Sequence, residues 1–273
     1  MVNQVVSIAR FVRHLRGGSQ PLLVEGTDGN LYVLKFQNNL QGSHVLFNES
    51  MGTELYRACG LQVPGWSPIY VDAQFIDDHR ECWLQAERGS IRPLSGWSFG
   101  SRFVQVPGTH LRDLLSGNDF KRVRNLDSFW LSWLIDVCAN HSDNRQALFV
   151  EHVSREFEAY FIDHGHLFGG AKGGEQPHPR VSRYLDGRVY AAIPEFSIER
   201  IEKTLKNLDA DALFKRAVEL PADWITEMDR KALESCLDRL KNPTLWQNVL
   251  HELLISCEGT CRYGSFPIPA ASA

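Results

Sequence analysis

The sequence contains no long hydrophobic run. Over its 273 residues, no stretch approaches the roughly 18 to 20 consecutive apolar residues that a membrane-spanning helix needs. Its start also lacks the pattern of a signal peptide, because the polar Asn3 and Gln4 are followed by the charged Arg10 and Arg13. We therefore expect a cytoplasmic protein without a membrane partner.

Positive charge is in slight deficit. The chain has 29 Lys and Arg residues against 33 Asp and Glu residues, which gives a net charge of -4 and a pI near 6.2. Proteins that bind nucleic acid usually carry a basic face. The composition therefore disfavours a direct nucleic-acid partner.

Metal-binding cysteine patterns are also scarce. The six cysteines are scattered, and only Cys257 and Cys261 have a metal-like spacing, without a CxxC pair or an ordered histidine cluster to complete a zinc site. A chain of this length can form a core without disulfides, so we expect reduced thiols.

Several common functional motifs are missing. The sequence has no GxxxxGK[ST] loop, no Rossmann glycine fingerprint and no GxSxG elbow, which makes a serine hydrolase a poor candidate. It also has no internal repeat and no low-complexity segment. The length suits one bilobal domain or two small ones.

What the first hundred residues do contain is strand signals. Segments 21–25 and 31–36 flank Asp28-Gly29-Asn30, a turn that predicts a β-hairpin. Apolar residues at helical spacing then predict a helix from about 44 to 59, which Gly60 ends. Further strands are expected at 65–71, 82–87 and 101–106.

Beyond Pro107-Gly108 the periodicity becomes helical. Leu111, Leu114 and Leu115 predict one helix, and an apolar stripe over 126–137 predicts a second, buried one. The polar loop 140–146, two short strands at 147–150 and 159–162, and a helical remainder from 198 follow. The pattern predicts an α+β fold with a strand-rich part, 1–106, and a mainly helical part, 107–273.

Four charged residues occupy informative positions. Lys35 interrupts an otherwise apolar strand, and Glu49 follows on the predicted helix. Asp143 lies in the polar loop, and Asp163 follows a hydrophobic strand directly before a glycine turn. Lys, Glu, Asp and Asp in this order match the parts of a protein-kinase-like fold, and two carboxylates so placed indicate metal-assisted phosphoryl transfer.

Six short motifs in the same order strengthen this interpretation. They are Gly17-Gly18-Ser19-Gln20-Pro21, residues 32–39 around Lys35, Phe47-Asn48-Glu49, Gly60-Leu61-Gln62-Val63-Pro64, residues 140–146 and Ile162-Asp163-His164-Gly165. Over about residues 15–170 the chain resembles the HipA-like kinases, a bacterial branch similar in fold to the phosphatidylinositol kinases. The resemblance implies a bilobal fold with a nucleotide-binding N-lobe, 1–106, and a C-lobe, 107–273.

The resemblance also implies cofactors and partners. It implies ATP and Mg2+, with transfer of the γ-phosphate to a hydroxyl acceptor, Ser or Thr of a protein in the first instance. HipA toxins phosphorylate an aminoacyl-tRNA synthetase and pair with a DNA-binding antitoxin, so an antitoxin-like partner is one option. Two other functions stay open: a pseudokinase that acts as a nucleotide-binding interaction module, and a kinase of small molecules or lipids.

Each candidate residue has a role and a plainer alternative. Lys35 would contact the α- and β-phosphates, or it is an edge-strand lysine that discourages aggregation. Glu49 would orient Lys35, with Glu54 as the competing partner and a solvated helix face as the alternative for both. Asp163 would ligate magnesium, or it caps a tight turn. His164 and His166 are expected to be polar turn residues.

The polar loop departs from the usual kinase spacing. Asp143 is the candidate base or orienter of the acceptor hydroxyl, but Leu148 stands five residues later, where a metal-binding Asn is usual. Gln146 or Asn144 is then the candidate metal ligand, while Asn140 and His141 could hold the loop through backbone contacts.

The loop before residue 22 is the candidate phosphate-binding loop. The backbone N–H groups around Gly17, Gly18, Ser19 and Gln20 could approach phosphate oxygens closely, although a lone Gly-Gly pair is also an ordinary turn. Ser19 is either a regulatory phosphorylation site or a turn residue. The aromatic Trp97 and Phe99 lie where a kinase hinge would pack on adenine, and we expect them to be core residues.

Overall fold

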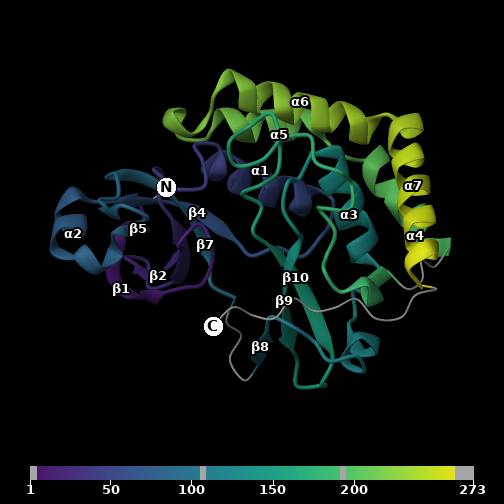
Figure 1. The fold of residues 1–273 in the computed structure, drawn as a ribbon, viewed down its shortest axis with the longest axis horizontal. Coiled ribbons are helices and arrows are strands. Elements are labelled where there is room, and N and C mark those ends of the chain that lie inside the picture. The colour runs from purple at the N-terminus through teal and green to yellow at the C-terminus, as the bar shows by residue number, and fades with distance from the viewer. Residues whose placement is uncertain (1–4, 105–108, 191–194, 262–273) are drawn as a thin grey trace.

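The computed structural model describes residues 5–104, 109–190 and 195–261 (Figure 1). Strands dominate the N-terminal part, and most helices belong to the C-terminal part, so the predicted fold class, α+β with a protein-kinase-like arrangement, is confirmed. The predicted boundary between residues 106 and 107 lies outside the described residues.

Five antiparallel strands form the N-terminal sheet, in the order β1-β2-β3-β7-β4. They are β1 (Ile8–His14), β2 (Leu22–Gly26), β3 (Leu31–Lys35), β4 (Trp66–Val71) and β7 (Gly96–Arg102). The predicted hairpin joins β2 to β3, where Gly29 takes a φ of 76° and the Asp28 carboxylate accepts the N–H of Asn30. A bridge between Ser7 and Tyr70 brings the segment before β1 to β4, so the two edges of the sheet approach each other.

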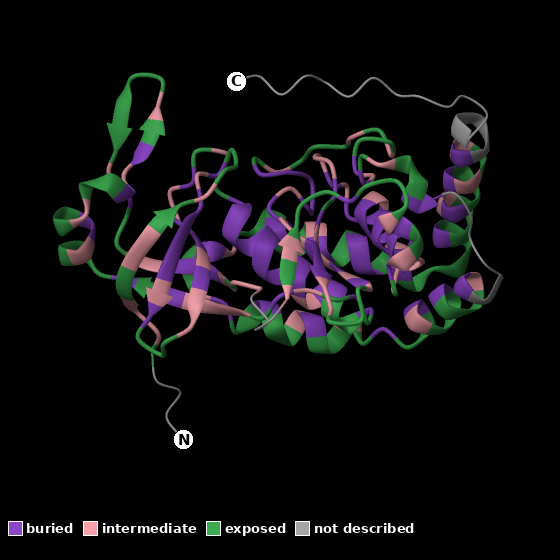
Figure 2. Ribbon diagram, turned by 90° about the horizontal axis from the view of Figure 1, so that it is seen from below, coloured by how far each residue is buried: buried purple, intermediate pink, exposed green. Residues whose placement is uncertain are grey.

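A small exposed unit is inserted between β4 and β7. It consists of α2 (Ala73–Asp78), the short helix η1 (Arg80–Cys82) and a hairpin of β5 (Leu84–Ala86) and β6 (Gly89–Ile91). The strand β6 is exposed along its whole length (Figure 2). Sequence patterns predicted β5 and missed the other three elements.

Helix α1 (Val45–Ala58) agrees with the predicted helix and is the most buried element near the N-terminal sheet. Eleven of its 14 residues are buried. It ends as expected at Gly60, whose φ of 73° allows the N–H of Leu61 to reach the carbonyl oxygen of Tyr56 at 3.0 Å.

Two hydrophobic cores divide the molecule. The smaller core lies within the N-terminal sheet and includes Leu34 and Phe36 on either side of Lys35. The larger core contains α1, through Phe47 and Leu55, together with the C-terminal elements. Helix α1 is therefore packed as part of the C-terminal half, although it follows β3 in the chain.

The C-terminal part combines a second sheet with helices. Its strands β8 (His110–Arg112), β9 (Gln146–Glu151) and β10 (Phe157–Ile162) lie in the order β10-β9-β8. The helices are η2 (Asp119–Arg122), α3 (Ser128–Cys138), η3 (Gly187–Tyr190), α4 (Glu195–Lys206), α5 (Ala210–Val218), η4 (Ala222–Trp224), α6 (Glu227–Lys241) and α7 (Pro243–Cys261). As predicted, α3 is buried, as are ten of its 11 residues.

Three local predictions were wrong. The helix expected around Leu111 is the strand β8, because this segment pairs with β9 and leaves Leu114 76% exposed. The strand expected at 101–106 overlaps β7, which begins five residues earlier and ends at Arg102, while positions 105 and 106 lie outside the described residues. Sequence patterns also missed β1, whose polar residues face solvent, so the glycine loop 16–21 joins two strands instead of preceding the first.

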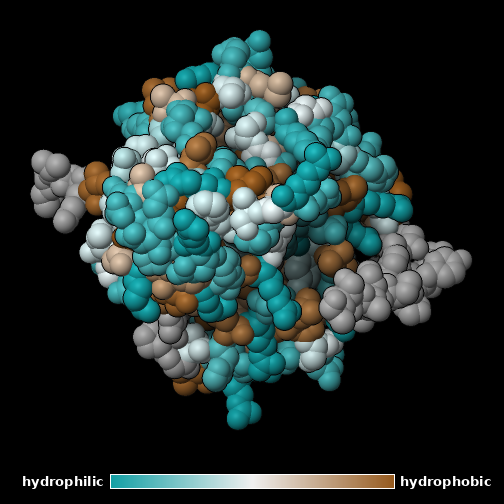
Figure 3. All heavy atoms as spheres, turned by 60° about the vertical axis from the view of Figure 1, so that its left-hand side comes forward, coloured by the Kyte–Doolittle hydropathy of each residue, from teal (hydrophilic) through white to brown (hydrophobic). Residues whose placement is uncertain are grey.

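No helix within the described ranges is both long and apolar enough to cross a membrane. On the face drawn in Figure 3, hydrophobic side chains are interspersed with hydrophilic ones.

The first prediction concerns Gly52, which lies where α1 meets the turn after β10. A Cβ atom at position 52 would lie 2.5 Å from Leu167 Cδ1 and 2.6 Å from His164 Cβ. We expect Gly52→Ala to lower the free energy of unfolding by about 1–3 kcal/mol, because overpacking outweighs the better helix propensity of alanine. Urea denaturation measures this loss. The control is Gly187→Ala, whose Cβ would meet nothing within 4 Å, and equal stabilities of the two variants would contradict the packing argument.

Candidate active site

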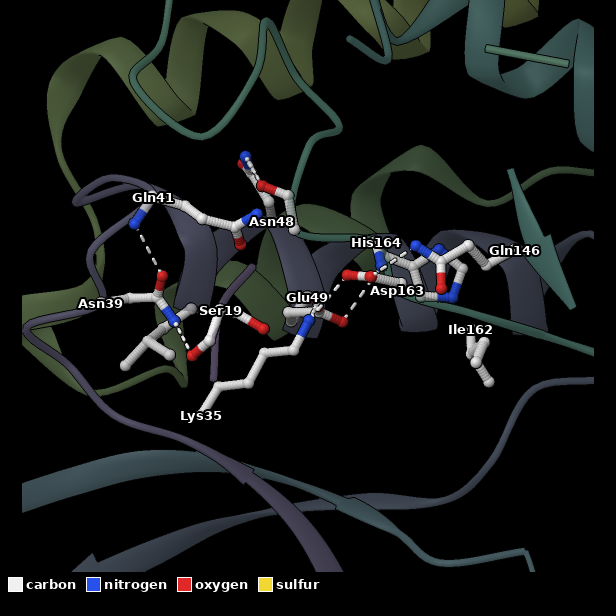
Figure 4. Close-up of polar contacts among 12 residues, drawn as sticks. Ser19, Lys35, Asn39, Gln41, Asn48, Glu49, Gln146, Ile162, Asp163 and His164 are labelled. Atoms are coloured by element: carbon white, nitrogen blue, oxygen red, sulfur yellow. Dashed lines mark hydrogen bonds and ion pairs between the residues drawn. The ribbon is translucent and has the colours of Figure 1, made fainter. Parts of the chain in front are cut away.

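A buried lysine lies at the centre of the candidate site. Lys35, the last residue of β3, donates from Nζ to the Glu49 carboxylate on α1 and to Asp163 Oδ1, the latter at 2.7 Å (Figure 4). The side chains of Lys35 and Glu49 are 7% and 3% exposed, whereas Asp163 is 29% exposed. Three elements that are distant in sequence thus converge on one ammonium group, and Asp163 offers the accessible edge.

The turn after β10 is held against α1. Asp163 takes a φ of 59°, a left-handed conformation that Asp adopts more readily than most residues. The second oxygen of Glu49, Oε2, accepts the N–H of His164 at 3.1 Å. Asn48 donates from Nδ2 to the carbonyl oxygens of Gly165 and Gly170, at 2.9 and 3.2 Å. A Cβ at position 165 would lie 3.1 Å from Glu49 Oε1, so glycine allows this close approach.

Burial and charge act in opposite directions on this cluster. Burial alone would lower the pKa of Lys35, but the charges of Asp163 and Glu49 outweigh it and raise that pKa. Burial would raise the pKa of Asp163, but Lys35 holds it below its ordinary value. For Glu49 burial prevails over Lys35, so its pKa is raised. Of the two carboxyl groups, Glu49 therefore binds a proton first as the pH falls.

The alternative partner Glu54 does not contact Lys35. Its Oε1 accepts from Arg57 Nη1 and from Trp66 Nε1, both at 2.7 Å. Phe99 is 1% exposed within the larger core, and Trp97 is partly buried and packs against the same core, as expected for core residues.

The polar loop contributes Gln146 directly. Gln146 begins β9 and donates from Nε2 to Asp163 Oδ2 at 2.9 Å. Asp143 is half-buried and accepts the N–H of Asn144 at 2.7 Å. Among the described residues, no hydrogen bond joins Asp143 to Lys35 or Asp163, although the neighbouring Ser142 N–H donates to the carbonyl oxygen of His166 at 3.0 Å.

Asn140 and His141 behave differently from each other. Asn140 Oδ1 accepts from Arg239 on α6 at 3.0 Å, so this side chain holds the loop through another side chain. His141 is 1% exposed, and neither ring nitrogen has a partner among the described residues. Burial, reinforced by the nearby Arg145, keeps the pKa of His141 well below its ordinary value, so the ring is neutral.

The glycine loop is anchored at two points. Gln20, with a φ of 48°, donates from Nε2 to the Gln85 carbonyl and accepts the Gln85 N–H, both at 2.7 Å. Asn39 donates to the Ser19 carbonyl oxygen at 3.3 Å, and Ser19 is only 5% exposed. Gly17 has a φ of 141°, and a Cβ at Gly18 would lie 2.9 Å from Gln41 Nε2. The Gln20 side chain is thus bound to the backbone of β5.

Sequence reasoning missed two charged residues beneath the site. Asp136 on α3 and Arg145 before β9 form a fully buried ion pair, with Arg145 Nη2 2.6 Å from Asp136 Oδ1. The signal was present in the sequence, because Asp136 interrupts an apolar helical stripe between Ile135 and Val137.

The described fold is similar to that of solved kinases. It matches the crystal structure of the proinflammatory kinase CtkA of Helicobacter pylori with a TM-score of 0.57 and 11% sequence identity, over 91% of this chain and 97% of that chain. Two structures of the Golgi casein kinase, one with Mn/ADP bound, match with a TM-score of 0.49, at 12% and 11% identity, over 94% and 98% of this chain and 73% and 78% of those chains. No protein-family model and no curated protein matches the sequence. The likeness to CtkA shows a protein-kinase-like fold.

The second prediction concerns the charge balance around Lys35. We expect Lys35→Met to lower the free energy of unfolding near neutral pH by about 3–5 kcal/mol, because Glu49 and Asp163 then face each other without a cation. Chemical denaturation over a pH series measures this loss. Lys231→Met, which removes an exposed lysine paired with Glu227, is the control.

The pH dependence of this variant has a defined sign. In the parent protein, the stabilisation from the lowered pKa of Asp163 is lost only as the pH falls below about 4, and that from the raised pKa of Lys35 only as the pH rises above about 10. In Lys35→Met the pKa of Asp163 is raised instead of lowered, and that of Glu49 is raised further, so the stability of this variant should increase as the pH falls from about 8 to about 5. A flat profile for Lys35→Met over this range would contradict the assignment.

Proposed function

We propose that the chain is a HipA-like kinase that binds ATP with Mg2+ and transfers the γ-phosphate to a hydroxyl acceptor, Ser or Thr of a protein. The observation that carries the proposal is the contact of Lys35 with both Glu49 and Asp163, which unites β3, α1 and the end of β10. The protein-kinase-like fold supports it, because in such a fold a lysine paired with a glutamate binds phosphate and an aspartate binds the metal.

The residues divide the work of phosphoryl transfer. Lys35 binds the α- and β-phosphates, and Glu49 keeps its ammonium group in place. The backbone N–H groups of Gly17, Gly18 and Ser19 cover the phosphates, while that of Gln20 donates to the carbonyl oxygen of Gly17 at 3.0 Å. Since charge spreads over the oxygens of the transferring group, such fixed donors stabilise the transition state without moving during the reaction.

Asp143 is proposed to orient the acceptor and take its proton. The hydroxyl oxygen attacks the γ-phosphorus, the bond from that phosphorus to the bridging oxygen of ADP breaks, and the hydroxyl proton passes to the Asp143 carboxylate. Asp143 is half-buried on a loop that Ser142 ties to the turn carrying Asp163, which supports this role.

The donor set fits magnesium. Within the described ranges, no cluster of three or more His, Cys, Asp or Glu side chains could hold a metal unaided. Magnesium, however, usually takes only one or two protein oxygens and completes its shell with phosphates and water. Asp163 Oδ2 and the Gln146 carboxamide, which are in contact at 2.9 Å, would hold it, and the ion would neutralise charge on the phosphates.

One observation favours a second candidate, a pseudokinase. Leu148, at the position of the usual metal-binding Asn, lies inside β9 and pairs with Tyr160, and its side chain has no atom that could ligate a metal. A site with Gln146 alone in this role could bind nucleotide without turning it over. Turnover distinguishes the two functions, and the identity of the labelled product distinguishes a protein acceptor from a small molecule or lipid.

The third prediction tests nucleotide binding. Mg-ATP should raise the thermal stability of the parent protein, by about 2.7 kcal/mol at a hundredfold excess over Kd. Asp163→Asn should lose most of this shift, because a neutral amide binds magnesium more weakly than a carboxylate does. Asp238→Asn, an exposed change on α6, is the control and should keep the shift. Absence of any shift in the parent protein at millimolar Mg-ATP would refute the proposal.

The fourth prediction separates binding from chemistry. Asp143→Asn should keep the thermal shift with Mg-ATP but lower the rate of phosphoryl transfer by about 100-fold or more, because a positioned base acts mainly in the transition state. Release of ADP in the presence of the acceptor, or autophosphorylation, measures the rate. Turnover within a few fold of the parent would remove Asp143 from the mechanism, and a parent protein that binds Mg-ATP without turnover would favour the pseudokinase.

A further inference from the structure

Arg145 lies directly beneath the proposed metal-binding turn and is completely buried. Its side chain and that of Asp136 are both 0% exposed. Nε and Nη2 of Arg145 donate to the two carboxylate oxygens of Asp136, at 2.9 and 2.6 Å. The pair is thus bidentate, which fixes the plane of the guanidinium group.

The third guanidinium nitrogen faces the backbone of the turn. Arg145 Nη1 donates to the carbonyl oxygens of Ile162 and Asp163, at 3.0 and 3.3 Å, and lies 3.3 Å from His164 Nδ1. These two carbonyl groups enclose the backbone of Asp163, the residue with the φ of 59°. A left-handed Asp persists only where its surroundings hold it.

Further groups hold the guanidinium from the other side. The Tyr56 hydroxyl on α1 donates to Asp136 Oδ1 at 2.6 Å, and the Arg145 guanidinium lies 4.9 Å from the centre of the Tyr56 ring. Burial alone would lower the pKa of Arg145, but Asp136 raises it, so the group stays charged. Helices α1 and α3 therefore fix a cation whose free edge points at the turn.

We propose that Arg145 is a positioning residue: by binding the carbonyl oxygens of Ile162 and Asp163, it holds the left-handed backbone that aims the Asp163 carboxylate at Lys35 and at the metal. The metal part of this inference rests on the proposed function; the backbone part does not.

An ion pair that served only core packing would need no such contacts. Two of the three guanidinium nitrogens donate to Asp136, and the third donates to the carbonyl oxygen of Ile162 in the turn. A lysine could neutralise Asp136 but could not reach both sites, because only arginine presents a planar fork of donors. The choice of arginine therefore points to the turn as its second target.

The test removes the charges in pairs to avoid leaving one of them unpaired in the core. In the double variant Arg145→Met with Asp136→Leu, the Tyr56 hydroxyl keeps Ser132 as a partner. The matched control is Arg200→Met with Asp127→Asn, which removes an Arg–Asp pair at the start of α3 whose side chains are 48% and 16% exposed. In both, hydrogen exchange is measured at the His164 N–H, which donates to Glu49, and at Leu134 within α3.

We expect exchange at His164 to quicken at least about tenfold relative to Leu134 in the double variant and not in the control. Mn2+ affinity in the presence of ATP should fall about 10- to 100-fold, as for other residues that orient a metal ligand. Arg145→Lys, which keeps the charge beside Asp136, should show the same change at His164 and decides the question if the double variant does not fold. Its melting temperature should stay nearer to that of the parent protein.

The outcomes distinguish this inference from the proposed function. Unchanged exchange at His164, or an equal acceleration at Leu134, would overturn the positioning role and leave Arg145 a packing residue. If the parent protein binds no Mg-ATP while His164 still loses protection, the positioning of Asp163 stands and the proposed kinase function fails. If Mg-ATP binds the parent and the double variant equally well, Arg145 does not act on the metal site.

Discussion

The structure depends on an ammonium group that lies at the border between two hydrophobic cores. Lys35 is the last residue of β3. The residues on either side of it, Leu34 and Phe36, belong to the smaller core of the N-terminal sheet. Its two acceptors, Glu49 and Asp163, lie on α1 and on the turn after β10, which are built on the larger core. Phe99 of β7 also packs in the larger core, but apolar contacts of this kind have little directional preference. A charge-assisted contact from one ammonium group to two carboxylates does have a direction, and it sets β3 against α1.

Buried polar contacts fix the position of α1. In protein kinases, activation acts through the placement of the helix that carries the glutamate. Here Asn48 donates to the carbonyl oxygen of Gly165 in the turn after β10. His44, which precedes the first turn of α1, has its Nδ1 2.5 Å from Asp229 Oδ1 on α6. Because these contacts are buried, moving α1 would expose unpaired polar groups. The contact between Lys35 and Glu49 therefore belongs to the packed interior of the folded chain.

Sequence patterns predicted the elements whose local signals agree with the final packing. The hairpin around Gly29, the helix that Gly60 ends and the charged interruption at Lys35 could all be identified, because turn chemistry and periodicity act over a few residues. The strand β8 was missed, since its pairing with β9 involves residues almost 40 positions away. Arg145 was missed for a related reason: nothing in its neighbours reveals that Asp136 and the turn at 162–163 would enclose it. Burial of a charge is a tertiary property.

The unusual spacing after Asp143 has a physical explanation in the register of β9 and β10. Gln146 is the first residue of β9 and pairs with Ile162, directly before Asp163. Two residues further along the strand, Leu148 is about 7 Å away and pairs with Tyr160. A loop shortened by two residues therefore brings a different residue to the start of the strand, where the carboxylate lies. Since that residue is a glutamine, its carboxamide lies beside Asp163 even though the usual position holds leucine. Its present contact with Asp163 uses the amide nitrogen, so a metal ion at this site would require the Gln146 amide to turn over.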